Sequence, residues 1–404
     1  MTEREPTRFS DLGSPKADMN DSTRRRYLAG LGTAVTAGLA GCNNLLGGDS
    51  DEGNPSQQVE VPALTQLRGS GSIVEGRPQP EGTSINDLPN LSGELSLYLG
   101  GGEGGIYREF VEILEQAYPE FTVLPTTNTS STLAQQIVEE VNSGASRADV
   151  FWSIDASSLA YVTQNDAVES LPEEVTSPVP DSFTGPDNAW VGIAGRARAI
   201  PYNTNELSED DIPNKVADFP NTPALQGTMG WAPTYGAFKS FITAMRLLRG
   251  EDATRQWLVD MREAGTERYG NEYVVSQQVA DGALNAGFAN HYYALRVQNQ
   301  RPDAPIDLAF TEGDAGALVN VAGATRIQGT DNADLADLFI RHLLTAEAQE
   351  FFATRSFAYP MIDGVQPVGD LPLVSELNPP EIDLSELSDL ETTLDLMEEA
   401  GVSG

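Results

Sequence analysis

The feature that most constrains the fold is a regular alternation of strand and helix patterns along most of the chain. Leu95, Leu97 and Leu99 alternate with other residues, as in a strand with one buried face. After a glycine-rich turn, Phe110 and Leu114 lie on one face of a helix pattern, and another strand pattern follows. Strands joined by helices in this way form βαβ units, so we predict an α/β fold with a parallel sheet.

The length predicts more than one lobe. The chain has 404 residues, and a single hydrophobic core usually stops growing at roughly 250–300 residues. A second block of strand and helix patterns begins near residue 200 and includes the helix patterns GAFKSFITAMRLLRG and EDATRQWLVDMREAG. We therefore expect two lobes, each with its own core.

The charge is strongly acidic. The chain has 60 acidic and 24 basic residues, a formal net charge of −36, and the carboxylates are spread over the whole length. At high salt such self-repulsion is screened, because the Debye length falls to about 3 Å at 1 M. We interpret the composition as halophilic adaptation. Nucleic acid is disfavoured as a partner, since phosphate binding needs clustered Lys and Arg.

The N-terminal region has the pattern of an export signal. Arg24, Arg25 and Arg26 precede a weakly apolar stretch that is too short to span a membrane. Twin arginines here resemble the signal for export of folded proteins, and the sequence LAGC resembles a lipobox with Cys42 as the lipidated residue. Because Cys42 is the sole cysteine, disulfides and thiol catalysis are excluded.

These patterns predict the location and the first two segments. Residues 1–41 are expected to be a twin-arginine lipoprotein signal. Residues 42–92 are rich in Gly, Ser, Asp, Pro and Gln and are expected to form a flexible tether. The protein is then a lipid-anchored protein on the extracellular face of the cell membrane.

Roughly residues 94–402 resemble a ferric-iron-binding substrate-binding protein of an ABC importer. The pieces that carry the resemblance stand in family order: LSLYLGG, ADVFWSIDASSL, WVGIAGRARAIPYNT, GWAPTYGAF, ANHYYAL, GDAGALVNVAGA, FAYPMI and LMEEAGV. The resemblance implies the periplasmic-binding-protein type II fold, with two α/β lobes, hinge strands and a central ligand cleft. Such lobes close around bound ligand by a hinge motion.

The resemblance also implies lobe boundaries and a function. Lobe 1 is expected to comprise residues 93–199 and about 316–370, and lobe 2 residues 200–315 and about 371–404. Its expected function is to capture ferric iron with a synergistic anion, phosphate or carbonate, and to deliver it to an ABC import permease. We expect a monomer and no enzymatic activity.

Tyr292 and Tyr293 are the expected centre of the site. Fe³⁺ is a hard cation that prefers anionic oxygen, and a bound metal can displace the proton of a phenol whose pKa is otherwise about 10. The strand pattern ALNAGFA ends at Asn290, a favoured helix-capping residue, so both tyrosines fall in the first turn of a helix. Without the resemblance, amphipathic packing of one or both tyrosines would be the favoured interpretation.

The resemblance implies an anion site beside the metal. Gly236 and Ala237 open a helix and supply backbone N–H groups, and Asn271 and Asn290 match assisting side chains. Tyr235 stands where many family members have a smaller polar residue. It is either a third phenolate ligand or a filler of the anion space.

The first lobe departs from the family pattern. Gly102 and Ile154 stand where some iron binders have histidine and glutamate, so we expect Glu103, Asp155 or the anion to replace them. Arg355 matches an arginine near the cleft of some relatives and is expected to contribute to the anion site. These departures leave open an alternative function: a binder of a phosphonate, a phosphorylated sugar or another small organic anion with the same fold.

An enzyme is the weaker interpretation. The sequence has no Gly-x-Ser-x-Gly elbow, no His-Glu-x-x-His motif and no Walker loop. Its two histidines are His291 and His342, and His342 falls in an apolar helix pattern typical of an interior residue. Little general acid–base equipment is left for catalysis.

Overall fold

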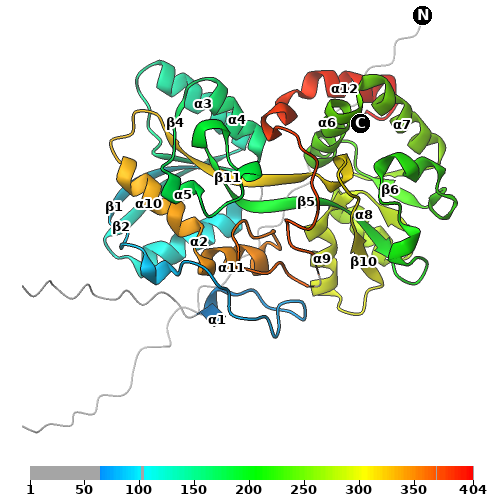
Figure 1. Cartoon of the computed structure of the whole chain (residues 1–404), viewed down its shortest axis with the longest axis horizontal. Helices are drawn as coiled ribbons and strands as arrows, with labels where there is room; N and C mark the ends of the chain where they lie inside the picture. Colours follow the sequence, from blue (N-terminus) through cyan, green and yellow to red (C-terminus); the bar gives the residue numbers. More distant parts are fainter. Residues whose placement is uncertain (1–63, 102–103, 370, 404) are drawn as a thin grey trace, which may run out of the picture. The chain divides into compact units, whose positions relative to one another are not determined.

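The computed structural model describes residues 64–101, 104–369 and 371–403. The predicted signal segment and the predicted lipidation site, Cys42, lie outside the described residues. The described residues form an eleven-stranded sheet. Eight of its strands follow the order β2-β1-β3-β11-β5-β8-β6-β7, and β4, β9 and β10 pair with strands of this path. Helices cover this sheet on both parts of the path (Figure 1).

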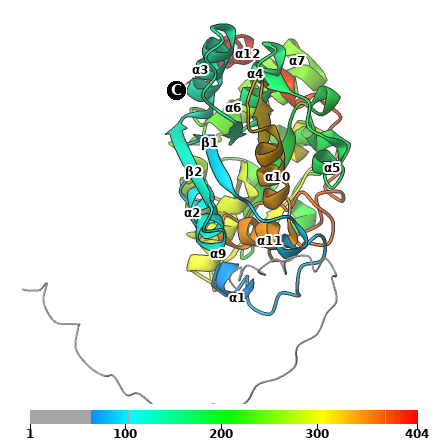
Figure 2. The same cartoon turned by 90° about the vertical axis from the view of Figure 1, so that its left-hand side faces the viewer.

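The first part of the sheet is built from the predicted βαβ unit. β1 (Gly93–Gly100) pairs in parallel with β2 (Phe121–Asn128) and with β3 (Val150–Ser153). The connecting helices are α2 (Gly104–Ala117) and α3 (Ser130–Asn142). Figure 2 shows α2 and β2 beside β1 on this part of the chain. Leu95, Leu97 and Leu99 are buried, as the alternation predicts.

Two long strands connect the first part of the sheet to the second. β5 (Val191–Asn203) and β11 (Val319–Ile327) pair with each other in antiparallel fashion. β11 also pairs with β3, while β5 continues to pair with β8 (Ala286–Gly287), β9 (Ala289–Asn290) and β10 (Ile306–Ala309). The stretch GRARAIPYNT falls within β5 and the turn that follows it.

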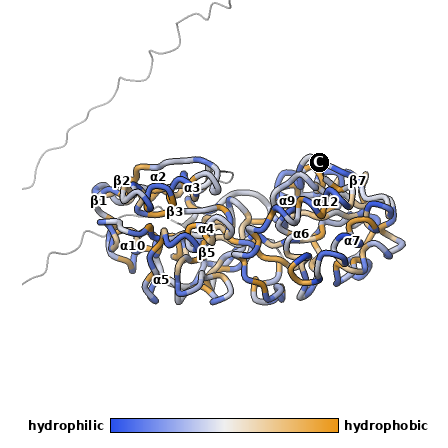
Figure 3. The backbone as a smooth tube through the Cα atoms, turned by 90° about the horizontal axis from the view of Figure 1, so that it is seen from above, coloured by the Kyte–Doolittle hydropathy of each residue, from blue (hydrophilic) through white to orange (hydrophobic). Residues whose placement is uncertain are grey.

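The second part has its own short parallel strands and helices. Its strands β6 (Met229–Trp231) and β7 (Glu267–Arg268) pair in parallel, and β6 pairs with β8. Its helices are α6 (Gly236–Arg249), α7 (Glu251–Glu263), α8 (Glu272–Ala280) and α9 (His291–Gln300). Figure 3 shows hydrophobic and hydrophilic residues alternating along the helices of both parts, as expected for helices with one buried face.

The C-terminal elements return to both parts. α10 (Ala333–Leu343) and α11 (Ala346–Arg355) pack on the first part, where Phe351 and Phe352 of α11 lie 5.1 and 5.2 Å from the ring of Phe110. A short 3-10 helix, η8 (Leu384–Ser388), packs against α4, and α12 (Leu390–Glu399) packs on α6 and α7.

The remaining elements are short connections, apart from α4. They are α1 (Leu64–Leu67), α4 (Ala156–Gln164), α5 (Glu173–Thr176), β4 (Val168–Glu169), η1 (Ile85–Asp87), η2 (Asp181–Phe183), η3 (Pro186–Asn188), η4 (Glu209–Asp211), η5 (Val216–Asn221), η6 (Pro223–Leu225) and η7 (Ala315–Ala317).

Residues 64–92 differ from the predicted tether, because they pack on the body of the protein. Glu350 of α11 is 1% exposed and forms ion pairs with Arg68 at 2.7 Å and with Arg77 at 2.9 Å. Ile85 and Leu91 are also buried. A carboxylate buried this deeply requires partner charges, and this segment supplies both of them.

Candidate metal and anion site

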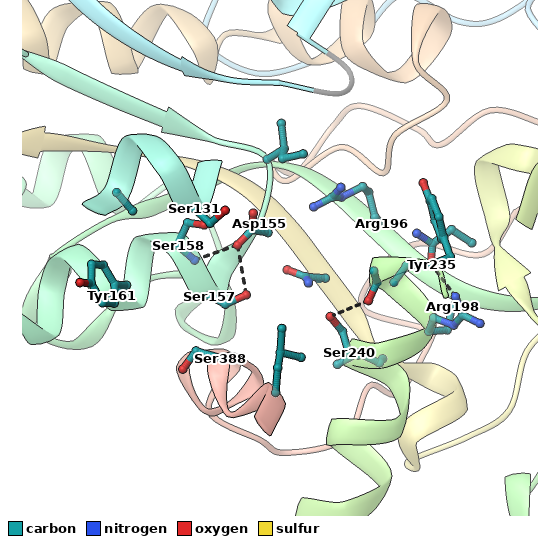
Figure 4. Close-up of a pocket in the computed structure, with 18 of the residues that line it drawn as sticks. Ser131, Asp155, Ser157, Ser158, Tyr161, Arg196, Arg198, Tyr235, Ser240 and Ser388 are labelled. Carbon is teal, nitrogen blue, oxygen red and sulfur yellow. Dashed lines mark hydrogen bonds between the residues drawn. The ribbon is translucent and has the colours of Figure 1, made fainter. Parts of the chain in front are cut away.

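A cavity of about 530 Å³ lies between the helices of the two parts (Figure 4). Three tyrosines and two arginines are among the residues that line it, together with several serines. The lining residues from α3 and α4 face those from α6 and from the start of α9. The full lining is Ser131, Ala134, Gln135, Ile154, Asp155, Ser157, Ser158, Tyr161, Arg196, Arg198, Tyr235, Gly236, Ala237, Ser240, Asn290, Tyr292, Leu318, Asn320, Ser388 and Leu390.

Tyr292 and Tyr293 are the second and third residues of α9. The helix begins directly after β9, whose Asn290 pairs with Arg198 of β5. This short strand therefore fixes the first turn of α9 against the long connecting strand. Tyr292 is 3% exposed and lines the cavity, whereas Tyr293 is 8% exposed and lies just behind the lining.

The hydroxyl groups of Tyr235, Tyr292 and Tyr293 belong to one hydrogen-bonded cluster. The hydroxyl of Tyr293 is bonded to that of Tyr235 and also interacts with that of Tyr292. The rings of Tyr292 and Tyr293 are 4.4 Å apart, and those of Tyr235 and Tyr293 are 6.1 Å apart. Residues 58 positions apart in the sequence thus bring three phenol oxygens together at one edge of the cavity.

Burial favours the neutral form of Tyr293. Burial raises the pKa of Tyr293 above its ordinary value, and the hydrogen bond to Tyr235 raises it further. The hydrogen bond to Tyr292 opposes this shift. Tyr293 is therefore a protonated phenol at neutral pH, and only a strong electrophile such as a metal cation would displace its proton.

A buried ion pair supports Tyr292 from behind. Arg198 is 3% exposed and is paired with Glu272, which is fully buried. Glu272 accepts a hydrogen bond from the backbone N–H of Asn290 at 2.8 Å. The amide of Asn290 accepts from Arg198 at 3.3 Å and donates to the hydroxyl of Tyr292 at 3.3 Å. Asn290 was expected to cap α9, but its side chain makes no capping bond and is directed to these partners instead.

Arg198 retains one unsatisfied donor. Its Nη2 is buried and has no hydrogen-bond partner among the described residues, although the side chain lines the cavity. A buried guanidinium nitrogen without a partner is unusual in folded proteins, since most buried donors are satisfied. Arg198 therefore brings a donor without a partner to the wall of the cavity.

The start of α6 supplies more free donors. Tyr235 occupies the N-cap position of α6 and makes no side-chain capping bond, so the N–H groups of Gly236 and Ala237 lack a side-chain cap at the cavity edge. By contrast, the start of α3 is capped by Thr129, whose side chain accepts a hydrogen bond from the N–H of Thr132. At the uncapped start of α6, backbone donors and the helix dipole therefore favour an anion at the cavity edge.

The opposite side of the cavity carries hydroxyl groups that already have partners. Asp155 caps α4: its Oδ1 accepts from the N–H of Ser158 at 2.8 Å and from the hydroxyl of Ser157 at 3.1 Å (Figure 4). The hydroxyl of Ser131 interacts with that of Thr129 at 3.3 Å. Asp155 therefore lies at the cavity as predicted, with one carboxylate oxygen occupied by helix capping.

Two predicted site residues lie away from the cavity, and a third is not among the described residues. Asn271 caps α8 by accepting a hydrogen bond from Val274 and is not part of the cavity lining. Arg355 is ion-paired with Glu109, donates to the backbone of Leu67, and lines a separate cavity of about 440 Å³. Glu103 lies outside the described residues.

Two neighbours of the tyrosines were not among the predicted site residues. The guanidinium of Arg296 lies 5.2 Å from the ring centre of Tyr292 and 5.6 Å from that of Tyr293, one turn along α9. In the sequence YYALR, Arg296 follows Tyr292 by four residues and Tyr293 by three, a spacing that indicates contact on a helix. His291 is fully buried, and its Nε2 is 2.7 Å from the carbonyl of Phe357, so it ties α9 to the segment after α11.

Two features are absent from the described residues. Over these residues, no three or more His, Cys, Asp and Glu side chains gather in a group able to hold a metal ion. Likewise, no helix of the described part combines the length and apolar character needed to cross a membrane.

Comparison with known proteins decides the family. Residues 145–384 match the family model described as bacterial extracellular solute-binding protein. The chain belongs to this family. Its membership and its fold agree with the predicted two-lobed, periplasmic-binding-protein architecture, which is thereby confirmed.

Relatives of this solute-binding protein have informative names. The major ferric iron-binding protein of Neisseria meningitidis serogroup B is 29% identical over 306 residues, covering 74% of this chain and 91% of the relative. The Fe(3+)-binding periplasmic protein of Serratia marcescens is 26% identical over 276 residues, covering 67% of this chain and 80% of the relative. The crystal structure of iron-bound HitA from Pseudomonas aeruginosa superposes with a TM-score of 0.66 and 26% identity, covering 76% of this chain and 99% of that structure.

Proposed function

We propose that this solute-binding protein captures ferric iron in the cavity through the phenol oxygens of Tyr235, Tyr292 and Tyr293. The observation that carries the proposal is the convergence of these three hydroxyl groups in one hydrogen-bonded cluster at the cavity. The names of the relatives support the same cargo, because those of Neisseria and Serratia are called ferric iron-binding proteins.

The chemistry of the cluster suits a trivalent ion. Fe³⁺ is a hard cation, and oxygen anions are its preferred ligands. Three phenolates would balance its three positive charges, so the bound ion would add no net charge to this largely buried cluster. Binding would release the phenol protons, because a metal replaces the proton on each oxygen. Arg296 and the Arg198–Glu272 pair would hold the rings and the backbone around the ion in place.

The same cavity would hold a small oxyanion beside the metal. The N–H groups of Gly236 and Ala237 and the unsatisfied Nη2 of Arg198 are the donors for it, with Asn290 between them and Tyr292. Phosphate or carbonate fits this set of donors. Asn271 and Arg355 were expected to contribute, but their own partners give no support to that role.

On the opposite side of the cavity, Asp155 is the candidate for a further ligand. Its Oδ1 is held by Ser157 and Ser158, an arrangement that fixes the carboxylate at the cavity edge. Glu103 remains a second candidate ligand. Closure would move lobe 1, residues 93–199 and 316–370, toward lobe 2, residues 200–315 and 371–404. This movement would bring Asp155 toward the tyrosines.

The proposal includes the cellular context predicted from the sequence. The protein is an exported, monomeric lipoprotein attached through Cys42 to the extracellular face of the membrane. It hands the iron to an ABC permease. The acidic composition would keep this protein soluble at high salt.

Titration with ferric iron in the presence of phosphate, followed by visible absorption, tests the proposal. We expect a phenolate-to-ferric charge-transfer band that saturates at one ion per protein and is lost in Tyr292→Phe. Tyr273→Phe is the matched control, because Tyr273 lies in the same aromatic cluster but its hydroxyl donates to Gln300 at 2.8 Å. Binding of an organic anion by calorimetry, with no colour on iron addition, would instead favour the alternative cargo.

A further inference from the structure

The C-terminal residues 383–402 connect the two sides of the cavity, and we call this segment the C-terminal clasp. Its first helix, η8, packs mainly against α4 and also touches α6, while its second helix, α12, packs on α6 and α7. Figure 1 shows this segment in red beside α6 and α7. The cavity is lined by Ser388, the last residue of η8, and by Leu390, the first residue of α12. Figure 4 shows Ser388 facing the residues of α4. The clasp therefore forms part of the cavity wall.

The helix η8, which packs against α4, buries its leucine side chains in the hydrophobic core. Leu387 is fully buried and Leu384 is 7% exposed. Within the part of the chain that the structure describes, the hydrogen bonds of η8 stay inside the clasp: Ser385 is bonded to Asp383, and Ser388 donates to the carbonyl of Ser385. Neither a hydrogen bond nor an ion pair joins η8 to α4 among these residues.

The contact of the clasp with α6 and α7 is different, because it is strongly polar. Arg246 of α6 pairs with Asp389 at 2.6 Å, and the hydroxyls of Thr243 and Thr393 are 2.9 Å apart in a buried contact. Three further arginines hold the rest of the clasp by ion pairs or backbone carbonyls: Arg255 to Glu399 at 2.8 Å, Arg262 to Ala400 at 2.8 Å and Arg268 to Val402 at 3.1 Å. One end is thus fixed by directional bonds and the other rests on burial of leucines.

The turn between the two helices can act as a pivot. Asp389 has φ −74° and ψ 74°, a conformation outside the helical region, so η8 and α12 are separate rigid pieces. Because apolar contacts are not directional, η8 can leave α4 and return without breaking a specific bond. α12 would stay on α6 and α7 throughout such a movement.

We propose that the clasp is a latch for the cavity. In the closed state η8 is docked on α4, and release of η8 accompanies the separation of α4 from α6 that admits or discharges the cargo. The latch holds whatever cargo the cavity takes, and its effect on iron exchange rests on the proposed function. Its strength sets how long the cavity stays closed, since a closed state persists only as long as its weakest joint holds.

The test uses Leu387→Ala in the full chain, with Leu394→Ala as the matched control. Leu394 lies in the same segment but is 42% exposed, so its truncation removes little buried contact. Hydrogen exchange by mass spectrometry reports the docking of η8 and α4. The rate at which the ferric, phosphate-loaded protein releases iron to EDTA measures how long the latch keeps the cavity closed. We expect Leu387→Ala to raise exchange in both η8 and α4 and to release iron at least about tenfold faster, as the loss of one buried leucine side chain predicts. Leu394→Ala should behave as the unmodified chain.

Two results would overturn the latch. The first is faster exchange in η8 of Leu387→Ala with an unchanged rate of iron release. The second is exchange in η8 that is the same with and without bound ligand in the unmodified chain, which would mean that η8 stays docked while the cavity opens.

If the unmodified chain takes up no iron, the proposed function fails and hydrogen exchange alone decides the latch. Increased exchange at the cavity-lining starts of α4 and α6 in ligand-free Leu387→Ala would then support it. Unchanged exchange at both helix starts would contradict it.

Discussion

The two sides of the cavity differ in the polar atoms that they offer to a ligand. The side of α6 and α9, which we call the phenol side, is lined by the half-buried Tyr235 and by the buried residues Tyr292 and Arg198. On the side of α3 and α4, the hydroxyl side, Ser157 and Asp155 are engaged in capping α4. The phenol side has the unsatisfied Nη2 of Arg198 and the uncapped start of α6, so we expect a ligand to bind there first.

The difference also has a structural origin. The phenol side rests on β5 through the pairing of Arg198 with Asn290 and on the buried pair between Arg198 and Glu272. This rigid support holds the tyrosines before any ligand arrives, which lowers the entropy lost on binding. We infer that the phenol side captures the ion and that the hydroxyl side closes over it.

The largest expected effect comes from removing phenol oxygens. We predict that Tyr235→Phe combined with Tyr293→Phe weakens ferric iron binding by more than about 100-fold, because even residues that only support metal ligands cost 10–100-fold. Competition with a chelator of known affinity measures the change. The matched change on the hydroxyl side, Ser131→Ala with Ser157→Ala, should weaken binding less than about tenfold. Equal losses of iron affinity in the two double variants would contradict the distinction between the phenol side and the hydroxyl side.

The buried Arg198–Glu272 pair, which supports the phenol side, should contribute strongly to the free energy of unfolding. Glu272→Gln leaves Arg198 buried without its counter-charge and is expected to lower the free energy of unfolding by about 3–5 kcal/mol. Urea denaturation at constant salt measures it. Glu112→Gln is the control: it breaks the exposed pair with Arg108, in which both side chains are more than half exposed, and should change stability by less than about 1 kcal/mol. A small effect of Glu272→Gln would show that the buried pair does not stiffen this side.

Acidification should lower the folding stability of both parts of the molecule to a similar extent. Burial lowers the pKa of His291, on the side of α9, and of His342, in α10, to about 4 in each case. The unfolded chain, with a histidine pKa of about 6.5, then binds more protons than the folded chain between pH 6.5 and 4. Stability should therefore be full above pH 6.5 and fall as the pH approaches 4, by up to about 3 kcal/mol for each histidine.

Thermal unfolding across this pH window measures the loss, and His342→Gln provides the control. This variant should retain roughly half of the pH dependence, which His291 would supply. A pH dependence that disappears entirely in His342→Gln would show that the region around α9 is less well packed than the burial of His291 indicates.

The smallest expected effect concerns Asp155. Asparagine caps helices as well as aspartate does, so Asp155→Asn should leave the stability within about 0.5 kcal/mol while removing a charge from the hydroxyl side. If Asp155 is a supporting residue at the cavity edge, iron affinity falls by less than about tenfold and the absorption band keeps its position. A shift of the band together with a larger loss would make Asp155 a direct ligand and would give the hydroxyl side an equal share in capture.

The fold was largely predictable from the sequence, because its signals are local. The alternation of Leu95, Leu97 and Leu99 and the helix patterns reflect burial of one face, and each can be recognised within a short window. Residues 64–92 were harder, since their polar composition resembles a linker. Their order depends on Arg68 and Arg77 meeting Glu350, a contact between segments more than 270 residues apart.

The candidate site was predictable only where neighbours in sequence are neighbours in space. Tyr292 and Tyr293 stand together in the chain, whereas the Arg198–Glu272 pair joins residues 74 positions apart and leaves no local pattern. Asn271 carried a local signal for a different role, because an asparagine directly before the helix pattern EYVVSQQVA is a typical N-cap.

Anomalous X-ray scattering at the iron edge, from crystals of the ferric and phosphate-loaded protein, tests the central claim most directly. The account predicts a single iron peak in the cavity, bounded by the phenol oxygens of Tyr235, Tyr292 and Tyr293. An iron peak elsewhere, or a cavity filled by an organic anion with no iron peak, would contradict it.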